Sequence, residues 1–163
     1  MVILVLTSMT GSVFAGTISP TVSVTATLSG VCKAGIAGSL AFTIDPSLAG
    51  PIAATKTDAT VFCSTGTAFT VTAASINKGG AVASCASSGS GITGTLKDAS
   101  NNLMDYTFKC GVNGTAGNTG TGQGHGSGKD VTLGIEGWIA AASYQNAPVS
   151  ATYADTVTLT ITY

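Results

Sequence analysis

The sequence has very few charged residues and no arginine. Lys, Asp and Glu together make up 8% of the chain, whereas charged residues are about 25% of an ordinary soluble domain. The six lysines are scattered singly, so no basic patch exists that could follow a phosphate backbone. This shortage argues against nucleic acid as a partner.

Side chains suited to catalysis are equally scarce. His125 is the single histidine and has no carboxylate or nucleophile beside it in the sequence, so we interpret it as a solvated loop residue. Glu136 is the only glutamate. Paired with Asp105 or Asp130 it would suggest a glycosidase, but scattered surface carboxylates explain these residues better. We predict no catalytic residue and no cofactor.

A complete phosphate-binding loop is missing as well. Gly128-Lys129 resembles the end of such a loop, but Asp130 stands where Ser or Thr is required, and position 123 is Gln rather than Gly. We therefore exclude nucleotide binding.

No hydrophobic run approaches the ~20 residues that a bilayer-spanning helix needs. Residues 1–15 contain a short apolar run and end in Val13-Phe14-Ala15, with small residues where a signal peptidase cleaves. We predict a signal peptide over 1–15, cleaved before Gly16. The usual positive charge at its start is missing, so the true translation start could lie upstream, and a short membrane span is the weaker alternative.

Four cysteines in an exported chain predict disulfides, because compartments beyond the inner membrane are oxidising. Sequence alone allows three pairings, and we favour Cys32 with Cys63 and Cys85 with Cys110. A zinc site is the competing interpretation. It is disfavoured because the chain has no CxxC pair and only one histidine, so we predict no metal.

The chain is instead rich in Gly, Thr and Ser arranged around short alternating apolar stretches, a pattern typical of a single all-β domain. Short strands at this spacing predict a β-sandwich. We expect a hairpin in which residues 64–67 join strands at 59–63 and 68–72. The glycine-rich stretch 111–128 is expected to be a surface loop. The other expected strands are 40–44, 92–97, 103–108, 131–135 and 153–163.

Two stretches alternate threonine or serine with apolar residues. Near the end of the chain, Val157, Leu159, Ile161 and Tyr163 form one apolar row, and nothing after them in this sequence covers the strand's edge. Residues 16–28 carry the second row. We expect residues 16–28 to be a donor strand and 29–163 to form the domain whose groove accepts it, with Val157, Leu159, Ile161 and Tyr163 as the acceptor row that partly lines this groove. The expected donor residues are Ile18, Val22, Val24 and Ala26.

Several segments together resemble the spore coat protein U-like family, which includes the major subunits of archaic chaperone-usher pili. The segments are Cys32 after a Thr/Val strand, Thr60-Val-Phe-Cys-Ser-Thr-Gly-Thr-Ala-Phe-Thr-Val71, Leu103-Met-Asp-Tyr106, Gly137-Trp-Ile139 and Tyr153–Tyr163. The resemblance implies an incomplete immunoglobulin-like β-sandwich and the Cys32–Cys63 pairing. It also implies a groove filled first by a periplasmic chaperone and then by a neighbouring subunit's N-terminal strand, with an outer-membrane usher as a further partner.

These observations predict a non-enzymatic structural subunit, exported through the periplasm to the cell surface. Copies of it would join head to tail in a pilus or fibre that serves adhesion or biofilm formation. Three alternatives stay open. A self-complemented secreted coat protein would remain monomeric, and a carbohydrate-binding module would use Trp138 with Tyr144 or Tyr153. A hydrolase would depend on His125 or Glu136.

Overall fold

The computed structural model describes residues 22–35, 38–85, 91–113, 117–150 and 152–163. The protein is all-β, and the only helix among these residues is one four-residue turn. The elements are β1 (Cys32–Ala34), β2 (Ile52–Ala53), β3 (Thr57–Cys63), β4 (Ala68–Ser75), β5 (Ala83–Ser84), β6 (Ile92–Lys97), β7 (Leu103–Val112), β8 (Thr119–Thr121), β9 (Val131–Ile139), α1 (Ala141–Tyr144) and β10 (Val157–Thr162).

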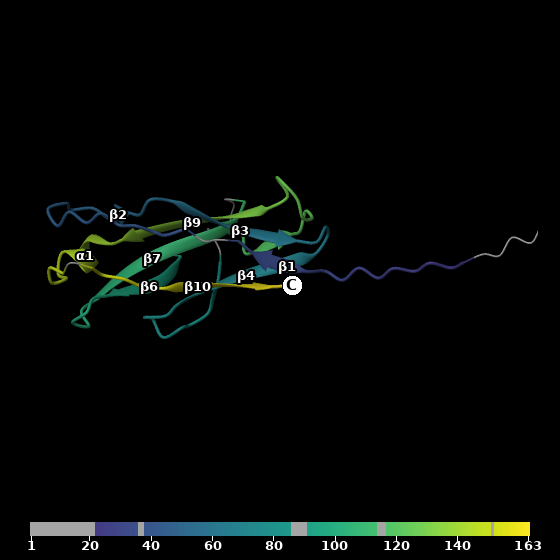
Figure 1. Ribbon diagram of the computed structural model, residues 1–163. Helices are drawn as coiled ribbons and strands as arrows, with labels where there is room; N and C mark the ends of the chain where they lie inside the picture. The colour runs from purple at the N-terminus through teal and green to yellow at the C-terminus, as the bar shows by residue number, and fades with distance from the viewer. Residues whose placement is uncertain (1–21, 36–37, 86–90, 114–116, 151) are drawn as a thin grey trace, which may run out of the picture.

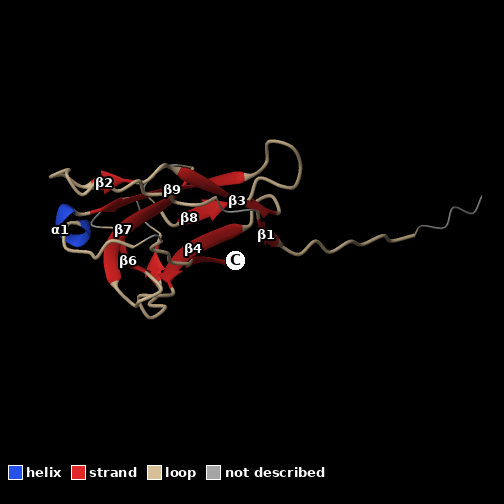
Figure 2. Ribbon diagram, turned by 60° about the vertical axis from the view of Figure 1, so that its left-hand side comes forward, coloured by secondary structure: helices blue, strands red, loops and turns tan. Residues whose placement is uncertain are grey.

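The strands form two antiparallel sheets that enclose one apolar core (Figures 1 and 2). The first sheet has the order β1-β3-β9-β7-β6, with β2 also paired to β9. The second has the order β10-β4-β5, with β8 also paired to β4. The sheet order places β10 at an edge, which is the feature that positions the site described below.

Alternation in the sequence explains which side chains enter the core. Along β9, Val131, Leu133 and Ile135 are buried while the residues between them are more exposed, and β4 buries Phe69 and Val71 in the same way. Successive side chains of a strand point to opposite faces, so each alternating stretch supplies one core-facing row. Strands are present at the expected stretches 92–97, 103–108 and 131–135, whereas the expected strand 153–163 is confirmed only over Val157–Thr162.

Both expected disulfides are confirmed. Cys32–Cys63 joins β1 to β3 within the first sheet, and Cys85–Cys110 joins the residue after β5 to β7 and so links the two sheets. Disulfides persist where the surroundings are oxidising, so the pairs indicate an extracytoplasmic environment. Among the described residues, no helix is both long and apolar enough to cross a membrane.

The expected hairpin of β3 and β4 is wrong, because the two strands lie in different sheets. Residues 64–67 do turn the chain, with Gly66 at φ 80° and Thr67 N–H donating to Ser64 O at 3.0 Å. The chain then crosses from the first sheet to the second. Alternation and a turn predict two strands and a reversal, but neither specifies which sheet each strand joins.

The glycine-rich stretch is also more ordered than expected. β7 continues through the buried Val112, and β8 pairs with the start of β4 inside this stretch. Gly120 of β8 lies directly over the Phe69 ring, where any Cβ would collide with the aromatic atoms. Glycine therefore permits a close backbone approach here, which composition alone does not distinguish from a loop.

Candidate functional site: an open groove beside β10

The last strand, β10, has one paired edge and one open edge. It pairs with β4 over its whole length, from Val157 opposite Ser75 to Thr162 opposite Thr70. No other strand in the described part of the chain pairs with its second edge. Its apolar row is only half-buried, although it faces the core. The strand therefore presents both a backbone edge and an incompletely covered apolar face.

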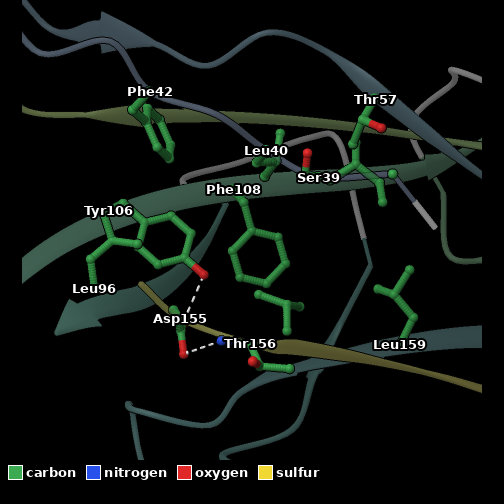
Figure 3. A pocket seen from close by; sticks show the side chains of 13 residues that line it. Ser39, Leu40, Phe42, Thr57, Leu96, Tyr106, Phe108, Asp155, Thr156 and Leu159 are labelled. Carbon is green, nitrogen blue, oxygen red and sulfur yellow. Dashed lines mark hydrogen bonds between the residues drawn. The ribbon is translucent and has the colours of Figure 1, made fainter. Parts of the chain in front are cut away.

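An apolar groove of about 300 Å³ runs along this face of β10 (Figure 3). Its floor is the buried pair Tyr106 and Phe108 of β7, and Val157 and Leu159 form one wall. Leu40 and Phe42, from a segment that belongs to neither sheet, form the opposite wall. The groove thus reaches core side chains that a complete second layer would cover.

The opposite wall is held in place by close packing against β9. Leu40 and Phe42 lie against Gly137, at which a Cβ would stand 3.2 Å from both side chains. Phe42 also contacts the Tyr106 ring edge-to-face, with centroids 6.0 Å apart. The sequence predicts a strand at 40–44, but the segment forms no ladder. It packs its alternate apolar residues over the first sheet and borders the groove instead.

A polar joint closes the groove at the start of β10. Lys97 of β6 and Ala154 exchange two backbone hydrogen bonds of 2.9 and 3.0 Å. The Asp155 carboxylate accepts hydrogen bonds from Tyr106 Oη at 2.8 Å and Ser75 Oγ at 2.6 Å, and from the backbone N–H groups of Asn77 and Thr156. These bonds tie both sheets together at one end of the groove.

The environment of the joint affects the ionisation of Tyr106. Burial, the hydrogen bond to Asp155 and the negative charge of Asp155 together raise the pKa of Tyr106 above its usual value. The phenol is therefore a neutral hydrogen-bond donor to Asp155 at physiological pH. This is a structural role, since all the polar groups of the joint face one another.

At alternate residues of β10, the backbone groups face the edge that no described strand pairs with. Ile76 N–H donates to Thr156 O, whereas Val71 of β4 bonds away from β10, to Asn118 and Cys85. Hydrogen bonding alternates along an antiparallel pair, so the threonines of β10 point their backbone groups at β4. The apolar residues Val157, Leu159 and Ile161 point theirs at the open edge. Val157 and Leu159 line the groove with their side chains, and Ile161 continues the same face of the strand.

The N-terminal tail carries the expected donor row and is fully exposed. Val22, Val24 and Leu28 are 84%, 87% and 91% exposed, and Figure 1 shows the described part of the tail leading away from the body. The tail is anchored at Val31, which exchanges hydrogen bonds with Ser64. Residues 1–15 and Ile18 lie outside the described residues.

The structure brings only part of the expected acceptor row into the groove. Val157 and Leu159 line it, Ile161 is half-buried further along β10, and Tyr163 borders a separate shallow hollow beside Phe69. The groove is also lined by residues that were not predicted from the sequence, namely the wall and floor residues Leu40, Phe42, Leu96, Tyr106 and Phe108. Their alternation was visible, but it does not reveal that these rows meet at a gap.

The residues considered for catalysis do not come together. Glu136 is ion-paired with Lys56, and Asp105 contacts Thr95 and Lys78. Glu136 stands opposite Lys109 in the ladder. Asp105 is four residues further along β7, roughly 14 Å away at ~3.4 Å per residue, whereas glycosidase carboxyl pairs lie about 5 to 9.5 Å apart. His125 is exposed.

The aromatic residues considered for sugar stacking make contacts within the protein. Lys109 Nζ lies 5.2 Å from the centroid of the half-buried Trp138 ring. Tyr144 is buried, and its single O–H lies 2.7 Å from the carbonyl oxygens of both Leu48 and Gly50 and can donate to either, while Tyr153 donates to Pro148 O. Among the described residues, the ring pairs in contact involve Phe42, Tyr106 and Phe108, so Trp138, Tyr144 and Tyr153 do not form a shared platform.

Comparison of the chain with protein-family models found no matching family, and comparison with curated proteins found no match either.

Proposed function

We propose that this protein is a non-enzymatic structural subunit that polymerises by donor-strand exchange into a pilus or fibre at the cell surface, in adhesion or biofilm formation. One observation carries the proposal. The chain combines an open apolar groove beside an unpaired strand edge with an exposed tail that has the matching apolar row. Strand addition uses these two features, because backbone bonds supply affinity and alternate side chains fix the register.

In this proposal the fold is an incomplete immunoglobulin-like sandwich. The missing strand would lie between β10 and the segment that contains Leu40 and Phe42, over the floor made by Tyr106 and Phe108. Its apolar side chains would cover the groove, and its backbone would satisfy the open edge of β10. Each fully buried Val or Leu contributes about 1.5 to 3 kcal/mol, so a junction of several such residues dissociates slowly.

The partners follow from the same groove. Before assembly an exposed groove of this kind promotes aggregation, and a periplasmic chaperone that lends a strand would cover it until an outer-membrane usher exchanges that strand for the tail of the next subunit. A contact between one subunit's tail and the next subunit's groove is head-to-tail and does not close, so it generates a filament.

The first experiment extracts the protein from the surface of the producing cell and compares unheated with boiled samples on a denaturing gel. We expect a ladder of multimers that collapses to one monomer band only on boiling, because exchanged strands are kinetically trapped but not covalent. A monomer band in both lanes would support the self-complemented coat protein instead.

A double variant tests the tail directly. Val22→Asp with Val24→Asp places charges in the apolar groove and should abolish the ladder. The matched control is Ser23→Asp with Thr25→Asp, which adds the same charge to the opposite row of the tail and should preserve it. Equal ladders from both double variants would contradict the donor role of these valines.

A further inference from the structure

The backbone of β10 restricts how a tail can bind. This restriction determines which tail residue pairs with which residue of β10, and the alternating sequence alone does not specify that register. The inference rests on the proposed function. Val157, Leu159 and Ile161 direct both side chain and backbone toward the incoming strand. In an antiparallel pair, a residue opposite one of them must face the groove and supply its own N–H and C=O.

The tail meets this requirement over a limited range. Its even-numbered residues form the apolar row Val22, Val24, Ala26 and Leu28. Pro20 belongs to the same row but has no N–H, so a ladder running through it would leave a β10 carbonyl without a donor. At the other end, Val31 is bonded to Ser64 of its own body. The tail available for pairing therefore lies within residues 22–29.

Only two registers place an apolar tail residue from the range 22–28 opposite each of Val157, Leu159 and Ile161. The lining of the groove favours the second of them. One places Ala26 opposite Val157 and pushes Leu28 against Asp155, whose carboxylate is hydrogen-bonded to Tyr106 and Ser75. An apolar side chain gains little beside a carboxylate. The other register moves the tail by two residues along β10 and brings Leu28 into the apolar part of the groove instead.

We infer that a neighbouring copy's tail binds antiparallel to β10 with Leu28 opposite Val157, Ala26 opposite Leu159 and Val24 opposite Ile161. Leu28 then covers Phe108 and Leu96, which line the groove. The small Ala26 faces the larger Leu159, so the two side chains fill the space together. Ile18 and Pro20 stay outside the paired stretch, and Leu28 becomes the main anchor.

This orientation requires a second molecule. The tail leaves its own body beside β1, close to the end of β10 (Figures 1 and 2). A tail that folded back into its own groove would run parallel to β10, and its even-numbered row would then turn its backbone groups away from that strand. Antiparallel pairing is therefore specific to exchange between copies.

The experiment is disulfide trapping with outward-facing residues, which leaves the groove unchanged. In the inferred register Thr25 stands opposite Thr160 in a non-hydrogen-bonded pair, with Cα atoms about 4.5 Å apart, within the range that a disulfide bridges. Thr25→Cys with Thr160→Cys should give a ladder that survives boiling and collapses only with reductant. Thr25→Cys with Thr158→Cys is the matched control for the register shifted by two residues.

A boiling-resistant ladder from the Thr158 pair instead would overturn the register while leaving donor-strand exchange standing. Cross-links confined to the monomer, or none in either pair despite a heat-sensitive wild-type ladder, would overturn the antiparallel pairing. Absence of any wild-type ladder before boiling would contradict the proposed function itself. Independently, Leu28→Ala should lower the temperature at which the wild-type ladder collapses, whereas Thr27→Ala should not. An equal decrease of the collapse temperature in both variants would contradict the role of Leu28 as the main anchor.

Discussion

The tail residues Val22–Leu28 and the strand Val157–Thr162 have nearly the same alternating sequence but different surroundings. In β10 the apolar row is half-buried against the core, and the threonines bond to β4. In the tail the valines and leucine are almost fully exposed, and the described residues contain no strand paired with it. The same pattern is a strand in one place and an unpaired segment in the other.

The difference teaches that alternation gives a stretch the capacity to be a strand, while a neighbouring edge makes it one. Here β4 provides that edge for β10, and nothing in the described part of the chain provides one for the tail. Changes in and around β10 should therefore affect folding of the protein, whereas changes in the tail should affect only the proposed assembly. Three measurements test this contrast.

The largest effect is expected at the joint that fixes the start of β10. Asp155→Ala removes the acceptor of the buried Ser75 and Tyr106 hydroxyls, and each unpaired buried group costs about 1 to 3 kcal/mol. We expect the free energy of unfolding to fall by about 2 to 4 kcal/mol in denaturant titrations of the purified protein. The control Asp58→Ala, on the exposed face of β3, should stay within about 0.5 kcal/mol of wild type.

A smaller effect is expected from equivalent truncations of the two rows. Leu159→Ala removes half-buried apolar surface from β10 and should lower the free energy of unfolding by about 1 to 2 kcal/mol. Val24→Ala should change it by less than about 0.5 kcal/mol, because the side chain is exposed in the single chain. Similar losses in the two variants would mean that the tail packs on its own body.

The smallest effect concerns alkaline pH. The pKa of Tyr106 is raised above the ordinary value of 10.0 by burial, by its hydrogen bond to Asp155 and by that residue's charge. Above pH 10 the unfolded chain therefore loses this proton before the folded chain does. Stability is fully present below pH 10 and decreases as the pH rises further. Tyr106→Phe should make the dependence of the free energy of unfolding on pH less steep between pH 9 and about 11. An unchanged slope would contradict a raised pKa of Tyr106 in the folded protein.

Much of the fold could be predicted from alternation because side-chain periodicity directly reports which face of a strand is buried. The strands β4, β6, β7, β9 and β10 were predicted in this way, whereas both disulfides were predicted from the four cysteines of an exported chain. Sheet membership was not, since the turn after Cys63 looks the same whether the next strand pairs with β3 or crosses to the other sheet. The groove wall at Leu40 and Phe42 was missed for a related reason. Their alternation resembles a ladder strand, and only tertiary packing on Gly137 shows otherwise.

The Cys32–Cys63 disulfide has a mechanical consequence if the tail links subunits. A pull on the tail first reaches β1, a strand of only three residues at the edge of its sheet. Hydrogen bonds of such a short strand would break one after another under tension. The covalent bond at the first residue of β1 instead passes the load to β3, which has seven residues and is flanked on both sides. Stretching force therefore reaches the interior of the sheet before β1 can peel away.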